Sequence, residues 1–144
     1  MPNDPPKVHF YDLPPDKQWG LVYKLADAAW RRETHVLIHC GDEGEARALD
    51  DFLWTFVEDA FVPHERLAGE GLEDPDARVV IVAAEVAPIA QAVLIQLAPV
   101  SVAFAREFET VIDFVDHRDD ARLAASRGRF KAWREAGVVP EFHK

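Results

Sequence analysis

Three basic residues and one phenylalanine near the C-terminal end have the types and spacing of a site that binds an anion. Arg127, Lys131 and Arg134 recur every three or four positions around Phe130, so a helix would place them together on one side. An aromatic face within a ring of cations is the chemistry of a pocket for an apolar, anionic peptide end. If this side faces solvent, the sequence predicts a peptide-binding pocket.

The stretch at 121–137, when laid on a helix, can be oriented in two ways. In one, a stripe of small residues docks closely on a sheet, and its members are Ala121, Ala125, Gly128, Ala132 and Ala136. In the other, Leu123, Phe130 and Trp133 enter the core, the alanines face water, and the basic side chains extend to solvent near the negative end of the helix dipole. The helical pattern alone does not choose between the two orientations.

The single cysteine, Cys40, marks a second candidate site. It follows His39 and precedes Asp42 and Glu43, at the end of an expected strand where α/β enzymes often hold catalytic groups. Neighbours on a strand point to opposite faces, so His39 cannot act as the base for the Cys40 thiol. Free cysteine is also among the most buried residue types. We predict no catalytic residue and keep an α/β enzyme with a site at Cys40 as the alternative.

The histidines and glycines do not indicate a metal or nucleotide site. The HExxH spacing is absent from His35, His39, His64 and His117, so a metal site would have to be assembled from distant strands. Neither GxGxxG nor GxxxxGK followed by Ser or Thr occurs, and the turn at 41–44 carries carboxylates, which repel phosphate. We therefore expect no metal and no cofactor.

Length and composition indicate one soluble domain over residues 1–144. The chain is 49% hydrophobic and 29% charged, as in a globular protein. Its apolar run at 79–89 is interrupted by Glu85 and Pro88 and is shorter than the roughly 20 residues of a membrane span. The N-terminal segment lacks the pattern of an export signal, and a lone cysteine fits a reducing compartment. We expect a cytoplasmic protein that does not bind membranes.

The charge is unevenly distributed along the chain. Residues 1–117 hold 9 basic and 22 acidic side chains, whereas residues 118–144 hold 7 basic and 4 acidic ones, for a net charge of −10. A strongly acidic protein has little general affinity for phosphate backbones, so we expect no direct contact with nucleic acid. The small basic end is sufficient for a short acidic peptide.

Alternating strand and helix patterns predict the fold. We expect strands at 7–13, 35–40, 78–84, 93–97 and 111–115, helices at 16–32, 43–55, 103–109 and 119–136, a short extended piece at 61–64 and a surface loop at 65–77. This order predicts a three-layer, Rossmann-like α/β fold, with a mostly parallel sheet between helices and no nucleotide-binding loop.

Large apolar residues crowd the end of the second expected helix and the loop after it. They are Trp54, Phe56, Val57, Phe61 and Val62, more than one helix face can bury. Two interpretations stay open: an exposed patch that binds another protein, or aromatic side chains of Trp54 and Phe61 that close the end of the core.

Five blocks in order resemble the chi subunit family of bacterial DNA polymerase III. They are FY at 10–11, VLIHCGDEGEARALDDFLW at 36–54, FVPH with LAGEG at 61–64 and 67–71, VIDFV at 111–115 and RFKAWREAG at 129–137. The resemblance implies a non-catalytic adaptor with a nucleotide-binding-like fold that has lost nucleotide binding. It also implies two partners, the psi subunit of the clamp loader and the acidic C-terminal tail of single-stranded-DNA-binding protein. That tail ends in an apolar aromatic residue that bears the terminal carboxylate.

The resemblance further implies which residues meet each partner. The tail site would comprise Arg127, Phe130, Lys131 and Arg134, with Val115 and Gly137 as walls and Arg122 near the place where the family commonly has a further lysine. The surface that meets psi would include Trp54 and Phe61. Of the two helix orientations, the resemblance favours the one that places Phe130 at a surface pocket.

Overall fold

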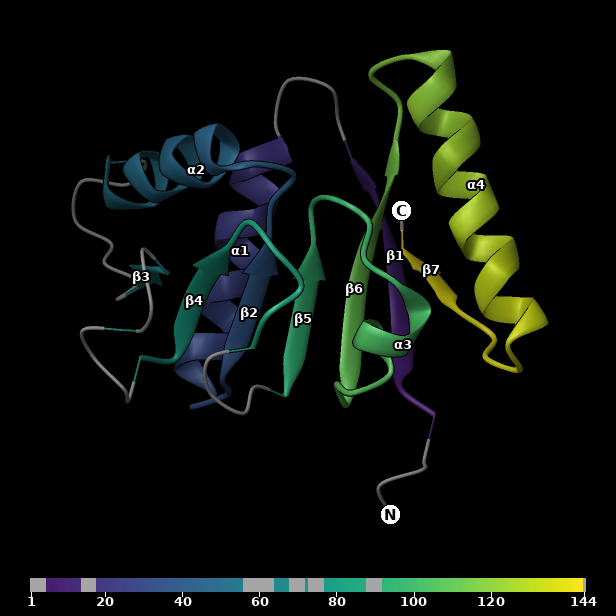
Figure 1. Ribbon diagram of the computed structural model, residues 1–144, viewed down its shortest axis with the longest axis horizontal. Coiled ribbons are helices and arrows are strands. Elements are labelled where there is room, and N and C mark those ends of the chain that lie inside the picture. Colours follow the sequence, from purple (N-terminus) through teal and green to yellow (C-terminus); the bar gives the residue numbers. More distant parts are fainter. Residues whose placement is uncertain are drawn as a thin grey trace.

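The computed structural model of the protein describes residues 5–13, 18–55, 64–67, 72, 77–87 and 92–143. Within these residues the chain forms a seven-stranded parallel sheet in the order β3-β4-β2-β5-β6-β1-β7 (Figure 1). The strands are β1 (Lys7–Leu13), β2 (Val36–His39), β3 (Glu65–Arg66), β4 (Val79–Val82), β5 (Val93–Gln96), β6 (Thr110–Asp116) and β7 (Glu141–His143). The helices are α1 (Gln18–Arg31), α2 (Glu43–Thr55), α3 (Val102–Ala105) and α4 (Asp120–Glu135).

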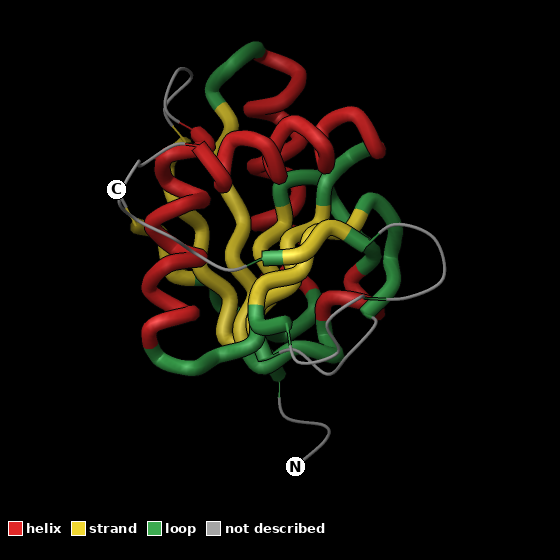
Figure 2. The backbone as a smooth tube through the Cα atoms, turned by 90° about the vertical axis from the view of Figure 1, so that its left-hand side faces the viewer, coloured by secondary structure: helices red, strands yellow, loops and turns green. Residues whose placement is uncertain are grey.

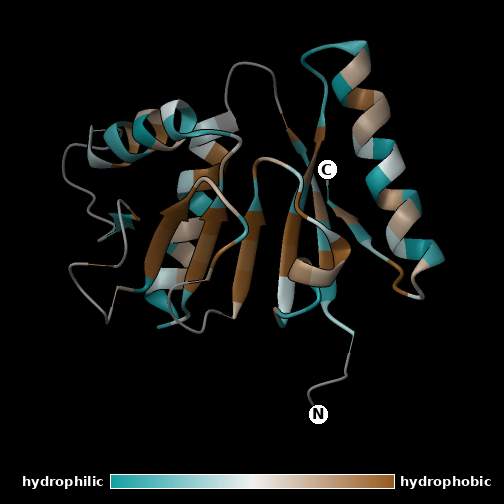
Figure 3. Cartoon of the chain, viewed as in Figure 1, coloured by the Kyte–Doolittle hydropathy of each residue, from teal (hydrophilic) through white to brown (hydrophobic). Residues whose placement is uncertain are grey.

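Two cores lie on the two faces of this sheet, and helices cover both (Figure 2). Helices α1 and α2 pack on the face that carries Val36 and Ile38 of β2, whereas α3 and α4 pack on the face that carries Leu37. Side chains alternate along a strand, so a strand covered on both faces must be apolar throughout. All four residues of β2 and of β4 are buried or nearly so, and the central strands are the most apolar part of the chain (Figure 3). The predicted three-layer α/β fold is confirmed.

Side-chain caps define the starts of the two helices nearest the candidate sites. Asp42 precedes α2 and accepts a hydrogen bond at Oδ1 from the backbone N–H of Glu45, at 2.8 Å. Asp119 precedes α4 and accepts one from the backbone N–H of Arg122, also at 2.8 Å. Each carboxylate satisfies a backbone donor that has no partner within the helix. The acidic turn after β2 therefore provides the N-terminal cap of α2.

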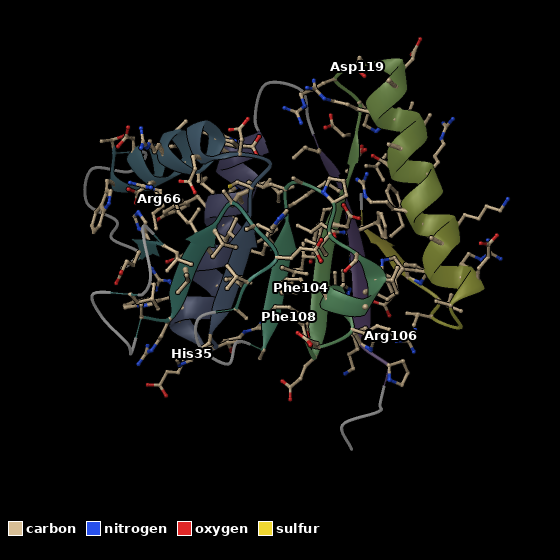
Figure 4. All side chains as sticks on the ribbon, viewed as in Figure 1. His35, Arg66, Phe104, Arg106, Phe108 and Asp119 are labelled. Atoms are coloured by element: carbon tan, nitrogen blue, oxygen red, sulfur yellow. The ribbon has the colours of Figure 1, made fainter. Side chains whose placement is uncertain are left out.

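The C-terminal end of α4 closes with a Schellman turn. Gly137 has a φ of 86°, and its N–H and that of Val138 donate to the carbonyls of Arg134 and Trp133. Arg106 adds a bond from Nη1 to the Ala136 carbonyl at 3.4 Å, and Figure 4 shows Arg106 and Asp119 near opposite ends of the helix. The turn reverses the chain and leads it into β7.

The structure differs from the sequence predictions in three places. Part of the expected loop at 65–77 is strand β3, in which Glu65 and Arg66 pair with β4. The expected helix at 103–109 is the four-residue α3, Val102–Ala105. Strand β7 was not predicted, because a three-residue edge strand carries too little periodicity to detect. The expected extended piece at 61–64 lies outside the described residues except for His64. Among the helices of the described chain, none has the length and apolarity of a membrane span.

Candidate binding site on helix α4

An open pocket of about 650 Å³ lies along the solvent side of α4. Its lining is Arg127, Phe130, Lys131, Arg134 and Glu135. Four of these five are the residues whose types and spacing predicted a binding site. The volume falls within the range of about 300–1,000 Å³ that is typical of small-ligand sites.

Phe130 forms the apolar floor of the pocket and is supported from the core. Its side chain is half-buried, and its ring meets the ring of Phe10 edge-on with the centroids 5.1 Å apart. Phe10 is fully buried in β1, and half-buried Val115 of β6 packs in the same cluster. The floor is therefore held by the sheet, while the outer part of the Phe130 side chain remains accessible.

The rotation of α4 about its axis follows the second of the two orientations. Trp133 is buried and Leu123 and Phe130 are half-buried. Of the small residues, Ala121, Ala125 and Gly128 are exposed, and Ala132 and Ala136 are half-buried. Docking through a stripe of small residues was therefore wrong. Polar contacts to β6 explain the rotation: Ser126 is buried and accepts a hydrogen bond at Oγ from the backbone N–H of Asp116, at 3.0 Å.

Arg129 makes the second polar contact between α4 and β6. Its Nε and Nη2 donate to the two carboxylate oxygens of Asp113 at 2.8 and 3.1 Å. Gln96 also donates to Asp113, at 2.7 Å, and the Asp113 side chain is completely buried. Burial raises the pKa of Asp113, and the bonds from Arg129, the Phe114 N–H and Gln96 oppose that shift.

The basic residues around α4 divide into two sets. Arg118, Arg122 and Arg129 form ion pairs with Asp116, Asp119 and Asp113, at 2.6, 3.3 and 2.8 Å respectively. The three cations of the pocket, Arg127, Lys131 and Arg134, are exposed and make no side-chain hydrogen bond or ion pair within the described part of the chain. Their charge is available to a ligand, and Glu135 is the acidic member of the lining.

The remaining residues expected at this site lie around the pocket rather than in its lining. Val115 packs behind Phe130, and Gly137 forms the turn that ends α4. Arg122 lies five residues before Arg127 on α4, is exposed, and pairs with Asp119. The pocket therefore comprises side chains from the second half of α4.

The second predicted surface lies at the other end of the sheet (Figure 1). Trp54 is in the last turn of α2, is 48% exposed, and packs its ring 4.3 Å from that of His64. Because Trp54 is exposed, it fits the interpretation as part of a protein interface better than the interpretation as a side chain that closes the end of the core. Phe61 lies outside the described residues.

Cys40 lacks the features of a nucleophile. Burial raises the pKa of its thiol to about 12, and the carboxylates of Glu45, Asp42 and Glu43 add to the shift. His39 is turned away and places Nδ1 2.9 Å from the carbonyl oxygen of Ala98. The thiol is therefore protonated and enclosed, which is the chemistry of a structural cysteine.

The carboxyl ends of the strands, where open α/β sheets usually bind ligands, are nearly filled. The pocket there has a volume of only about 20 Å³, close to the space needed for one water molecule. Its lining includes the ion pairs Arg118–Asp116 and Arg129–Asp113, together with Gln96, which donates a hydrogen bond to Asp113. Among the described residues, this pocket has no room for a nucleotide.

Sequence reasoning missed one cluster of possible metal ligands. His9, Glu141 and His143 bring their ligand atoms within 4.8 Å of one another. The prediction of no metal site considered spacing among other histidines and did not include these residues. Glu141 and His143 alternate in the sequence, as two residues on one face of a strand would. Recognising them as partners of His9 also requires knowing that β7 pairs with β1.

Comparisons with known proteins agree on one family. The family described as DNA polymerase III chi subunit, HolC, matches residues 6–141. The chain is 32% identical over 141 residues to DNA polymerase III subunit chi of Pseudomonas aeruginosa, an alignment that covers 96% of each protein. It is 38% identical over 117 residues to the protein of the same name from Escherichia coli, covering 81% of this chain and 78% of that one. The Haemophilus influenzae protein of that name is 34% identical over 117 residues, covering 81% and 80%.

Proposed function

Because this chain belongs to the DNA polymerase III chi subunit family, we propose that it is a non-catalytic accessory subunit of a bacterial DNA polymerase III. In this proposal it works in the cytoplasm during DNA replication. It connects the clamp loader, through the psi subunit, to single-stranded-DNA-binding protein. The contact with that protein is made through the acidic C-terminal tail, without direct contact between this chain and DNA.

The observation that carries the proposal is a group of three exposed cations around a half-buried phenylalanine, none of which has an acidic partner in the described part of the chain. Arg127, Lys131 and Arg134 offer charge to the acidic residues and terminal carboxylate of a tail. Phe130 offers an apolar surface to its terminal aromatic side chain, and aromatic pairs contribute about 0.5–1.5 kcal/mol beyond the area they bury. An open pocket on one helix suits the free end of a peptide.

A titration with a fluorescent peptide that copies the tail tests the site. We expect micromolar binding, roughly −7 to −9 kcal/mol. The variants Arg127→Ala and Lys131→Ala should each weaken binding about tenfold, because each removes a charge-assisted hydrogen bond. Arg47→Ala is the matched control, since Arg47 is an exposed residue of α2 outside the pocket. Equal affinity in wild type and both pocket variants would remove the assignment.

Trp54 supports the second half of the proposal, a contact with psi at the end of α2. Tryptophan is enriched among the residues that dominate protein interfaces, and this one is about half exposed. In a co-purification of both subunits, Trp54→Ala should reduce the psi recovered, whereas Val102→Ala on the opposite face should not. Full recovery of psi with Trp54→Ala would place the interface elsewhere.

A further inference from the structure

We propose that His9, Glu141 and His143 form a binding site for a zinc ion at the edge of the sheet. Strands β1 and β7 run parallel, and their register pairs His9 with Glu141 and Tyr11 with His143. Because alternate residues of a strand share a face, the three candidate ligands project from the same face of the sheet. Two imidazoles and one carboxylate are a ligand set that zinc favours in proteins.

The distances between the ligand atoms fit a single ion. His9 Nδ1 lies 2.9 Å from His143 Nε2 and 3.3 Å from Glu141 Oε2, and His143 Nε2 lies 3.8 Å from the same oxygen. Tetrahedral zinc with bonds of about 2.0–2.1 Å separates its ligand atoms by about 3.3–3.4 Å. The three distances scatter around that value, so small side-chain rotations would suffice to coordinate the ion.

The surrounding residues hold the two imidazoles in place. The Tyr11 ring stacks on His143, with centroids 4.7 Å apart and planes 18° from parallel. His9 is on β1 beside Phe10, which is fully buried and anchors the strand from the other face. The Glu141 and His143 side chains are 69% and 38% exposed, so an ion can enter from solvent and keep a water as its fourth ligand.

Such an ion would fasten the last strand to the sheet. β7 has three residues, and its only strand partner in the described sheet is β1. Coordination by one residue of β1 and two of β7 would cross-link the strands. The site opens on the face opposite the Phe10–Phe130 contact, so zinc binding and the pocket on α4 can be tested separately.

Calorimetric titration of the untagged full chain with zinc chloride tests the proposal. We expect one ion per chain and at least tenfold weaker binding in both His9→Ala and His143→Gln. His117→Ala is the matched control, because His117 is an exposed histidine that contacts Asp12 outside the cluster. Circular dichroism and binding of the tail peptide check that each variant is folded.

Cobalt(II) chloride provides an independent readout. Wild type and His117→Ala should give the intense visible absorption of four-coordinate cobalt, zinc should remove it, and both cluster variants should lack it. Three results would overturn the proposal: no zinc binding by the wild-type chain, equal binding by the two cluster variants, or an equal loss in His117→Ala. In that case the short contact between His9 and His143 is a hydrogen bond between imidazoles.

Discussion

Neighbouring basic residues of α4 have different roles, which depend on whether the side chain points to the sheet or to solvent. Arg129 points to the sheet and is held by Asp113, whereas Arg127 and Lys131 point to solvent and have no acidic partner in the described chain. The first kind of residue positions the helix. The second kind provides the charge that a ligand can use.

Replacing Arg129 with methionine should destabilise the fold. The change keeps much of the apolar stem but leaves the completely buried Asp113 carboxylate without its cation, which costs about 3–5 kcal/mol at buried pairs. Urea unfolding followed by circular dichroism measures the loss. Arg127→Met, at an exposed position two residues earlier, should stay within about 0.5 kcal/mol of wild type. Similar stabilities for the two variants would show that the Asp113 pair does not hold α4.

Replacing Glu135 with glutamine should strengthen binding of the acidic tail. Glu135 is the one carboxylate in the pocket lining, and it repels a ligand that the other three charged residues attract. An exposed charge pair is worth about 0.2–1 kcal/mol, so we expect affinity to rise by roughly 1.5- to 5-fold at low salt. Anisotropy titrations at two salt concentrations measure the change, which should shrink as salt screens the charges. Unchanged affinity would place the tail away from Glu135, and weaker binding would contradict the expected repulsion.

The Cys40 thiol should not react with alkylating reagents in the folded protein. Its pKa is raised to about 12 and its side chain is fully buried, so the reactive thiolate is scarce at neutral pH. Mass spectrometry after iodoacetamide treatment at pH 7 should show no label in buffer and complete labelling in urea. Rapid labelling of the folded chain would reopen the alternative of an enzyme with its site at this strand end.

Among the elements, helices and strands with a long pattern of apolar residues could be predicted from the sequence. Strands of two or three residues, and the orientation of a helix set by polar contacts, could not. The bounds predicted for β1 and α2 are confirmed residue for residue, because the strand and helix patterns of apolar residues marked them. Strands β3 and β7 have two and three residues, too few for a period to appear. The four main pocket residues were predicted from spacing on one helix, whereas the His9 cluster required the pairing of strands distant in sequence.

The rotation of α4 about its axis could not be predicted from the sizes of its side chains. Ser126 and Arg129 turn the helix toward β6 through hydrogen bonds, and these residues belonged to neither of the two faces considered. A helical wheel that weighs only apolar and small residues does not detect such contacts. Knowledge of the buried Asp113 on β6 would have supplied the missing partner.

Replacing Gly128 with alanine tests this orientation of α4. Gly128 is exposed within the helix, and a Cβ added there would meet no atom within 4 Å. Alanine is favoured over glycine in helix interiors by about 1 kcal/mol, so the free energy of unfolding in urea should rise by about that amount. If the small-residue stripe were docked on the sheet, the added methyl would clash and the variant would lose stability instead.

For the whole molecule, the proposed function places its two protein partners at opposite ends of one sheet. Trp54 lies at the end of α2, beside the β3 edge, and the cationic pocket lies on α4, beside the β7 edge (Figure 1). The chain as a whole has a net charge of −10 and therefore repels an acidic tail, and the exposed cations of the pocket, which lack an acidic partner in the described residues, offset that repulsion locally. This separation would let an adaptor hold both partners at once.

The central claim is that the acidic tail binds in the pocket on α4, and a nuclear magnetic resonance titration tests it most directly. The ¹⁵N-labelled protein is titrated with the unlabelled tail peptide, and backbone amide shifts are followed across the chain. We expect the largest changes at Arg127, Phe130, Lys131 and Arg134, with little change around Trp54. Shifts concentrated at Trp54, or at the carboxyl ends of the central strands, with none on α4, would contradict the account.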